Sequence, residues 1–344
     1  MKKFLTENLK ESPLYKKDKG EIICLACRRY CRIKEGGYGF CKVRFNMGGK
    51  LYAPYGYVSS LAFDPIEKKP LYHFLPGYKT LSFGMFGCNF NCLYCQNYEI
   101  SQAGEVTDLS PDLIDSGAII KLALENKIEI IVSTYNEPTV SLEWAKEIFS
   151  KFKVINKNFK TGFVSNGYIS QEAVDYLSGF IDFIKIDLKS FDKEKHRKLS
   201  TAELSNVLNS IRYIYSKKNI WIEIVTPIVI GFNDSLKEIK ELADFIVSLS
   251  RDIPLHLTAF HPDYKMLDFE YTDPFTIKKL ADISKKAGLR YVYGGNISDI
   301  ELNSTYCPEC GKLLIERVQI KTIDNKLKAG TCPFCNFRIA GIWR

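Results

Sequence analysis

The chain of 344 residues lacks any long apolar segment. No run approaches the roughly 18 apolar residues of a membrane-spanning helix. Residues 1–8 carry charge but no apolar region of the kind found in a secretory signal peptide. The composition, with 46% hydrophobic and 26% charged residues, also differs from that of a disordered or fibrous chain. We therefore expect a globular, cytoplasmic protein without a membrane span.

A large excess of one charge is missing as well. The formal net charge is +8 and is spread along the chain, so it permits an acidic partner without requiring one. Basic residues are not interleaved with aromatic residues as on a nucleic-acid-binding surface, so we do not expect a nucleic-acid partner. A chain of this length has room for one large domain of about 200–250 residues with small appendages.

Cysteine, by contrast, is clustered. The eleven cysteines form three sets, of four at residues 24–41, three at 88–95 and four at 307–335. Thiols stay reduced in the cytosol, so these sets indicate metal binding more than disulfides. We predict a four-cysteine segment over residues 1–76, a central domain over 77–300 and a four-cysteine domain over 301–344.

The central set is Cys88, Cys92 and Cys95, in a Cys-x3-Cys-x2-Cys pattern with no fourth cysteine nearby. A [4Fe-4S] cluster normally has four cysteine ligands, so three leave one iron open to a substrate or cofactor. An open position is what distinguishes a catalytic metal site from a structural one. The alternative is a zinc or ferredoxin-type site that a distant cysteine completes.

The carboxyl-terminal set consists of two Cys-x2-Cys pairs, Cys307 with Cys310 and Cys332 with Cys335. The segment between them reads as a hairpin, with strands at 313–320 and 327–331 and a turn at 324–325. Two such pairs on a hairpin predict a zinc ribbon, and rubredoxin-type iron is the alternative. Four thiolates leave no open position, so we expect a structural or partner-docking role.

The amino-terminal set is Cys24, Cys27, Cys31 and Cys41. We interpret it as a zinc site, with a second [4Fe-4S] cluster able to pass electrons as the alternative. A third interpretation has three cysteines on the metal and Cys41 in packing. The nearby arginines would offset thiolate charge in each case.

Between residues 79 and 293, short β-rich runs alternate with amphipathic helical stretches. This repetition predicts an α/β fold with a parallel sheet covered by helices, and the number of repeats favours a barrel or partial barrel, with a doubly wound sheet as the alternative. Ser110 is the expected N-cap of the first long helix, with Pro111 at its first position. The expected strands are 79–83, 128–133, 161–164, 180–187, 220–225, 255–260 and 290–293; the expected helices follow Ser110 and Pro138 and lie near 170–179, 202–216, 235–249 and 273–287.

Polar residues follow these strands, at the ends where barrel enzymes carry their chemistry. They are Glu137, Asn166, Asp187, Lys189 and His261. Each has a simpler interpretation: Glu137 could favour the next helix's N-terminus, Asn166 could form a turn with the following glycine, and Asp187 with Lys189 could be a solvated ion pair.

The Cys88–Cys92–Cys95 pattern, with Tyr94 before its last cysteine, resembles the signature of radical S-adenosylmethionine (SAM) enzymes. That resemblance implies a [4Fe-4S] cluster with SAM on its open iron and a partial (β/α)6 barrel. It also implies reductive cleavage of SAM to a 5′-deoxyadenosyl radical that abstracts a hydrogen atom from the substrate. Reduced ferredoxin or flavodoxin would then be the electron donor, and the substrate could be a protein.

The resemblance also implies roles for the polar residues at the strand ends. Glu137 would hold the methionyl ammonium of SAM, although Tyr135 and Asn136 stand where the family has two glycines. Asn166 would face the ribose or the methionyl carboxylate. Asp187 and Lys189 are similar to the Asp-x-Lys of glycyl-radical-enzyme activases, in which a histidine in the position of His261 lies near the cofactor.

Residues 39–44, 64–77 and 341–343 extend the resemblance to the pyruvate formate-lyase-activating-enzyme-like proteins, and more narrowly to the AmmeMemoRadiSam branch. Residues 28–30 depart from the Cys-Pro-His context that this branch carries there. The motifs do not imply a substrate. Modification of a protein or small molecule, activation of a glycyl-radical enzyme, and a non-catalytic multi-zinc binding module therefore all stay open.

Overall fold

The computed structural model describes residues 7–102 and 111–344. The chain divides into two compact units. Unit 1 comprises residues 1–64, 79–184 and 206–220, and unit 2 comprises 65–78, 185–205 and 221–344. Within the described residues, no helix is both long enough and apolar enough to cross a membrane.

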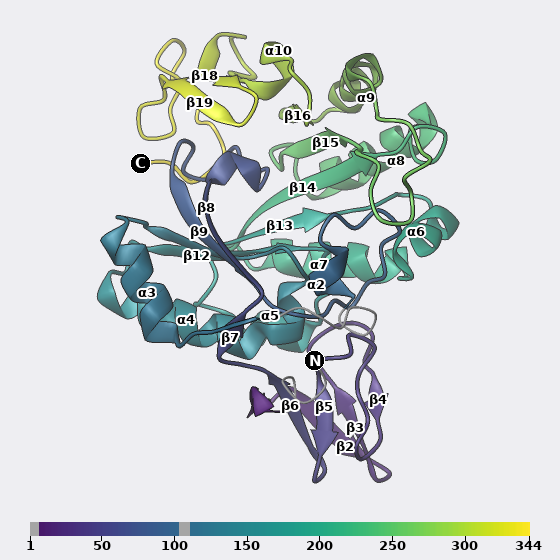
Figure 1. The fold of residues 1–344 in the computed structure, drawn as a ribbon. Helices are drawn as coiled ribbons and strands as arrows, with labels where there is room; N and C mark the ends of the chain where they lie inside the picture. The colour runs from purple at the N-terminus through teal and green to yellow at the C-terminus, as the bar shows by residue number, and fades with distance from the viewer. Residues whose placement is uncertain (1–6, 103–110) are drawn as a thin grey trace. The chain divides into compact units, whose positions relative to one another are not determined.

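The chain forms an α/β fold around an eight-stranded sheet (Figure 1). In unit 1 the strand order is β8 (Ser60–Pro65), β9 (Lys79–Gly84), β11 (Ile130–Ser133) and β12 (Lys160–Ser165), followed by the start of β13 (Phe183–Asp187). In unit 2 the rest of β13 is followed by β14 (Trp221–Ile228), β15 (Leu255–Ala259) and β16 (Val292–Gly295). Strand β11 pairs in parallel with β9 and β12, and β15 pairs in parallel with β14 and β16. The predicted strands and the parallel sheet are thus confirmed.

The helices of unit 1 are α2 (Tyr98–Ser101), α3 (Ser116–Glu125), α4 (Leu142–Ile155), α5 (Gln171–Tyr176) and α7 (Leu204–Ser216), with a 3-10 turn η2 (Pro138–Ser141). Helices α3 and α4 lie side by side (Figure 1). Helix α4 buries Trp144, Ile148 and Phe152, the face that four-residue spacing predicts.

The predicted start of the first long helix is wrong. Pro111 is not helical, residues Asp112–Leu113 form strand β10, and α3 begins at Ser116 with Asp115 as N-cap. The Asp115 carboxylate accepts a hydrogen bond of 2.9 Å from the Ala118 N–H, which satisfies a donor that the first turn leaves without a partner. Ser110 itself lies outside the described residues.

The amino-terminal part of unit 1 consists of short antiparallel strands, drawn in purple in Figure 1. One sheet has the order β1 (Leu9–Glu11), β6 (Lys50–Pro54), β5 (Phe45–Met47), and another has β2 (Tyr15–Asp18), β3 (Glu21–Cys24), β4 (Arg32–Ile33). A third pair joins β7 (Tyr57–Val58) to β10. Of the four cysteines at residues 24–41, Cys24 ends β3, Cys27 and Cys31 lie between β3 and β4, and Cys41 lies between β4 and β5.

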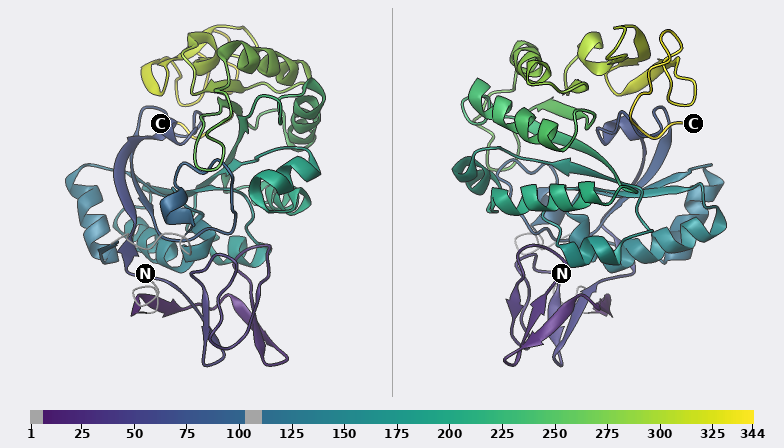
Figure 2. Two further views of the ribbon diagram at one scale, coloured as in Figure 1. Left: turned by 45° about the vertical axis from the view of Figure 1, so that its right-hand side comes forward. Right: turned by 180° about the vertical axis from the view of Figure 1, so that it is seen from behind.

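Unit 2 contains η1 (Ile66–Lys68), α6 (Lys193–Ser200), α8 (Leu236–Leu249), α9 (Pro274–Lys286) and α10 (Ile300–Asn303). Helix α9 packs on β15 and β16 and beside α8, as the green segments of Figure 2 show. The three-stranded sheet β17 (Thr305–Tyr306), β18 (Leu313–Val318), β19 (Lys321–Asn325) follows. Its hairpin turns at residues 319–320, where Gln319 adopts a φ of 54°, so the predicted turn at 324–325 is wrong.

Unit 2 also buries a polar network around Glu223. This carboxylate accepts hydrogen bonds from the His73 N–H at 2.9 Å, and it lies 2.7 Å from Nε2 of His256. The His73 ring lies 2.6 Å from both the Tyr293 hydroxyl and the Ala340 carbonyl oxygen. Burial lowers the pKa of His73 to about 4, which keeps its ring neutral near pH 7.

Candidate active site

The loop that follows β9 carries the three central cysteines in unit 1. Cys88, Cys92 and Cys95 are each partly exposed. The Phe90 N–H donates to Cys88 Sγ at 3.4 Å, and Cys95 Sγ lies 3.2 Å from the Ser101 hydroxyl. Burial, together with the neighbouring Cys92 and Glu137 charges, raises the pKa of the Cys88 thiol well above its usual range. A bound metal would reverse this preference, because coordinating thiols are deprotonated.

Asn136 holds the start of the cysteine loop. Its side chain accepts a hydrogen bond from the Met85 N–H at 3.1 Å and donates to the Gly87 carbonyl at 2.8 Å. Gly87 has a φ of 89°, and a Cβ there would lie 2.7 Å from the Cys41 carbonyl oxygen, so this position requires glycine. Asn136 therefore fixes the loop with a side chain, at one of the positions where the family has glycine.

Glu137 is buried, and both oxygens of its carboxylate accept hydrogen bonds from other protein groups. It accepts hydrogen bonds from the Thr139 N–H at 3.1 Å, the Ser165 hydroxyl at 2.9 Å and the Asn166 N–H at 2.8 Å. Burial raises its pKa, although these hydrogen bonds oppose the shift. Glu137 is also the N-cap of η2, as its simpler interpretation predicts.

Asn166 joins Glu137 to the cysteine loop. Its Nδ2 donates to Asn89 Oδ1 at 2.7 Å and lies 3.9 Å from Cys88 Sγ. The structure thus brings two predicted cofactor-binding residues, Glu137 and Asn166, to one of the predicted metal ligands. Sequence reasoning missed Ser165 and Asn89, whose roles depend on contacts between distant segments.

Asp187, in unit 2, lies between two lysines at the end of β13. Lys185 Nζ forms a short ion pair with one carboxylate oxygen, and Lys189 Nζ lies 3.3 Å from the other. Although burial opposes the shift, the two lysines lower the pKa of Asp187. Burial lowers the pKa of Lys185, a residue that the sequence analysis did not select. Asp187 and Lys189 therefore form a largely shielded ion cluster, not a solvated surface pair.

His261, also in unit 2, has a side chain that is half exposed. Its Nδ1 lies 3.6 Å from a carboxylate oxygen of Asp263, and its Nε2 lies 3.1 Å from the Tyr271 hydroxyl. The neutral ring can therefore donate from one nitrogen and accept at the other.

The carboxyl-terminal set forms a compact four-thiol group in unit 2. The ligand atoms of Cys307, Cys310, Cys332 and Cys335 all lie within 4.8 Å of one another, and in the described part of the chain only this set of three or more potential ligands meets that spacing. The Sγ distances are 3.6 Å for Cys307–Cys335 and 3.8 Å for Cys310–Cys332. Tetrahedral Zn²⁺ with bonds of about 2.3 Å gives sulfur separations of roughly 3.8 Å. The group can therefore hold one zinc ion.

The four amino-terminal cysteines of unit 1 surround one cavity, which also contacts Arg29, Arg44 and Asn89. Burial raises the pKa of Cys24 to about 11, while Arg44 lowers it in part. These four positions therefore converge, as their spacing in the sequence predicts.

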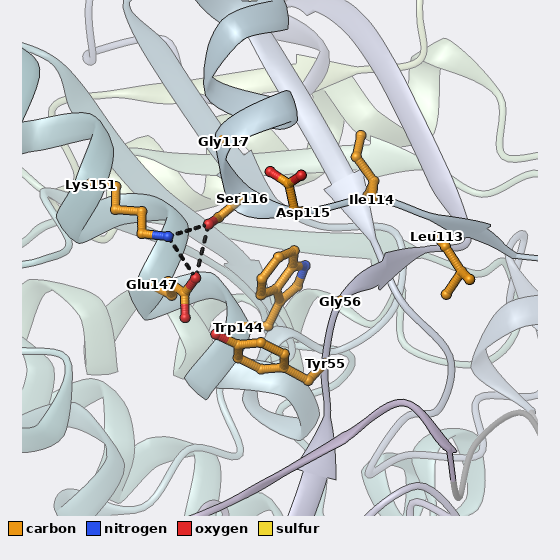
Figure 3. A pocket seen from close by; sticks show the side chains of 10 residues that line it. All are labelled: Tyr55, Gly56, Leu113, Ile114, Asp115, Ser116, Gly117, Trp144, Glu147 and Lys151. Atoms are coloured by element: carbon orange, nitrogen blue, oxygen red, sulfur yellow. Dashed lines mark hydrogen bonds and ion pairs between the residues drawn. The ribbon is translucent and has the colours of Figure 1, made fainter.

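A separate hollow of about 610 Å³ lies on unit 1, between the start of α3 and one side of α4 (Figure 3). Lys151 Nζ donates to the Ser116 hydroxyl at 2.7 Å and pairs with Glu147 at 2.9 Å, so these two charged groups neutralise each other. Trp144 packs edge-on against Tyr55, and both line the hollow. The hollow contains none of the predicted site residues.

Comparison with known proteins agrees with this arrangement. The sequence model of the Radical SAM superfamily matches residues 83–246. "Uncharacterized protein MJ0808" of Methanocaldococcus jannaschii is 38% identical over 340 residues, which cover 96% of this chain and 99% of that protein. From the same organism, "Putative glycyl-radical enzyme activating enzyme MJ1632" is 28% identical over 204 residues, covering 58% of this chain and 75% of that protein.

The "Pyruvate formate-lyase-activating enzyme" of Staphylococcus aureus is 24% identical over 230 residues, which cover 63% of this chain and 89% of that enzyme. The match to the family model includes the end of β9, the three-cysteine loop, Glu137 and Asn166. The chain therefore belongs to the radical SAM superfamily of enzymes.

Proposed function

We propose that this protein cleaves S-adenosylmethionine reductively and abstracts a hydrogen atom from a protein or small-molecule substrate. The observation that carries the proposal is the Cys88–Cys92–Cys95 loop directly after β9, within the segment that matches the family model. Three thiols fit a [4Fe-4S] cluster with one iron open to a cofactor. When bound, cluster and SAM together supply a 5′-deoxyadenosyl radical.

In this proposal the three cysteines hold the cluster, and Asn136 and Asn89 fix the loop that presents them. Asn166 places an amide beside Cys88 and Asn89, where it can also donate to a bound cofactor. Glu137 orients Asn166 through its backbone N–H. Its carboxylate can in addition accept a charge-assisted hydrogen bond from the methionyl ammonium.

We further propose Asp187, Lys189 and His261 as cofactor-binding residues. The Lys189 ammonium is suited to a carboxylate of SAM, and Asp187 holds that ammonium in place within unit 2. Lys185 supports this arrangement by pairing with the other carboxylate oxygen of Asp187. One electron for each cleavage would come from reduced ferredoxin or flavodoxin.

Activation of a glycyl-radical enzyme is the second candidate. The names of the two relatives at 28% and 24% identity favour it, and their matches cover 58% and 63% of this chain. We rank modification of another protein or small molecule slightly higher, because the chain adds two four-cysteine segments to the central domain.

The test is an anaerobic assay of the reconstituted full chain with dithionite and SAM. Equimolar 5′-deoxyadenosine and methionine are expected from the wild type, and neither from Cys92→Ala. Cys335→Ala is the matched control, since it removes a thiolate from the ribbon and should keep the activity. A wild-type protein with an intact cluster and no 5′-deoxyadenosine would contradict the proposal, and zinc in place of iron at the central set would favour the non-catalytic module.

The two candidates differ in the radical product. If the protein is an activase, incubation with its partner enzyme should yield a glycyl radical, visible by electron paramagnetic resonance (EPR) as a doublet. The absence of that signal with a co-purifying glycyl-radical enzyme would leave the modification of another substrate.

A further inference from the structure

The four amino-terminal cysteines of unit 1 have an arrangement unlike that of the ribbon. Cys24, Cys27, Cys31 and Cys41 line one cavity, together with Arg29, Arg44 and Asn89. The first of these cysteines ends β3, the next two lie between β3 and β4, and the last lies between β4 and β5, so the four sulfurs reach one place from separate parts of the segment.

Sulfur spacing separates the two four-cysteine sets. The ribbon thiols lie within 4.8 Å of one another, as ligands of one ion must. Among the described residues, no three of the amino-terminal thiols reach that spacing, although Cys24, Cys31 and Cys41 are close enough for their charges to interact. The same wider spacing holds for Cys88, Cys92 and Cys95. Thiolates of a [4Fe-4S] cluster bind different irons, so they lie farther apart than thiolates on a single ion.

The groups around the cavity can stabilise a negatively charged cluster. The side chains of Arg29 and Arg44 line it, and Arg44 is buried. The Phe40 N–H donates to Cys31 Sγ at 3.4 Å. Backbone N–H groups of Ala26 and Val43 also point to the sulfurs of Cys24 and Cys41. Hydrogen bonds to the sulfurs and nearby charge are the means by which proteins tune the potential of such clusters.

The cavity adjoins the loop of the central cysteines. Asn89, the residue after Cys88, lines it, and Arg29 Nε donates to the Asn89 carbonyl at 2.6 Å. On the other side of Cys88, Gly87 contacts the backbone of Cys41 so closely that no side chain fits there. The cavity of the amino-terminal cysteines and the loop of the central cysteines are thus in direct contact within unit 1.

We propose that Cys24, Cys27, Cys31 and Cys41 bind a second [4Fe-4S] cluster, and that zinc, our first interpretation from the sequence, is not the native metal there. With a protein thiolate on each iron, this cluster has no open position and cannot bind SAM. Because the cavity contacts the loop of the central cysteines, a cluster in it can exchange single electrons with a metal centre on those cysteines. The proposal does not rest on the proposed function, since it concerns only metal binding.

Metal and sulfide analysis of the anaerobically reconstituted full chain tests it. Two clusters predict about eight irons and eight sulfides per chain, together with one zinc. The triple variant Cys88→Ala/Cys92→Ala/Cys95→Ala should keep about four of each, and Cys24→Ala/Cys27→Ala should also keep about four. The matched control, Cys335→Ala, should lose zinc and keep all the iron.

The spectrum of the triple variant identifies the remaining cluster. After reduction with dithionite, its [4Fe-4S] EPR signal should not change on addition of SAM. A triple variant that folds with its ribbon zinc but binds no iron would overturn the proposal, and so would one that binds a second zinc ion in place of the iron. Neither result would contradict the proposed function, because formation of 5′-deoxyadenosine by the wild type is measured separately.

Discussion

Replacing Glu137 by glutamine keeps the shape of the side chain and removes one hydrogen-bond acceptor. In the structure, the carboxylate accepts from the backbone N–H groups of Thr139 and Asn166 and from the Ser165 hydroxyl. A glutamine carbonyl can serve only one of these N–H groups and turns an NH2 group toward the other. A buried donor left without a partner costs about 1–3 kcal/mol. The neutral amide also avoids burying a charge, which offsets part of this cost.

We therefore expect Glu137→Gln to lose roughly 1–2 kcal/mol of unfolding free energy, measured by urea unfolding of the anaerobically reconstituted protein. Because Asn166 lies beside Asn89 and 3.9 Å from Cys88 Sγ, the variant should also show a raised KM for SAM. Ser165→Ala is the matched control. It leaves the carboxylate and both of its backbone donors in place, although it also removes the acceptor of the Gly167 N–H, which lies at 3.0 Å. The KM of Ser165→Ala for SAM should therefore rise less than that of Glu137→Gln. Equal KM values for the two variants would refute the reasoning.

Three further predictions concern the zinc ribbon, the Arg44–Glu143 ion pair and the buried His73 ring. Cys335→Ala should lower the zinc content by about one ion per chain and leave the iron content unchanged, as metal analysis can show; an unchanged zinc content would contradict the ribbon site. Arg44→Met leaves Glu143 buried without its cation, which lies at 2.5 Å, and should cost about 3–5 kcal/mol in urea unfolding; Arg44→Met/Glu143→Leu should recover part of it. His73 has a pKa lowered to about 4 in the folded state, so its contribution is present above about pH 6.5, the pKa of the unfolded state, and falls by about 3 kcal/mol as the pH drops toward 4. Unfolding at several pH values should show this slope, with a smaller slope in His73→Gln.

The sheet could be predicted from the sequence because its strands are short β-rich runs separated by amphipathic helices. Strand β9, for example, lies within one residue of its predicted bounds. The apolar face of α4 follows from the spacing of Trp144, Ile148 and Phe152. Helix α6 escaped prediction, since its eight residues are mostly charged and carry no apolar periodicity.

Local turn signals were less reliable. The pair Asp324–Asn325 is typical of turns, yet both residues lie in β19, and the hairpin turns at Gln319 instead. Strand pairing, which depends on the partner strand, decides this position. The start of α3 shows the same limit. The pair Ser110–Pro111 is typical of a helix start, yet α3 begins at Ser116 and its N-cap is Asp115.

Part of the candidate site could also be found from the sequence, because the cysteine spacing and the polar strand ends are local patterns. The contacts that assemble it are not local. Asn166 meets Asn89 across 77 residues, and Ser165 meets Glu137 across 28. The sulfur spacing that separates the two four-cysteine sets likewise exists only in the folded chain.

The central claim is that the cluster on Cys88, Cys92 and Cys95 has an iron that SAM can reach. EPR spectroscopy of the dithionite-reduced protein, recorded with and without SAM, tests this claim most directly. We predict a new signal on addition of SAM to the wild type and none in Cys88→Ala/Cys92→Ala/Cys95→Ala. A wild-type spectrum that SAM leaves unchanged, in protein whose central cluster is shown to be intact, would contradict the account.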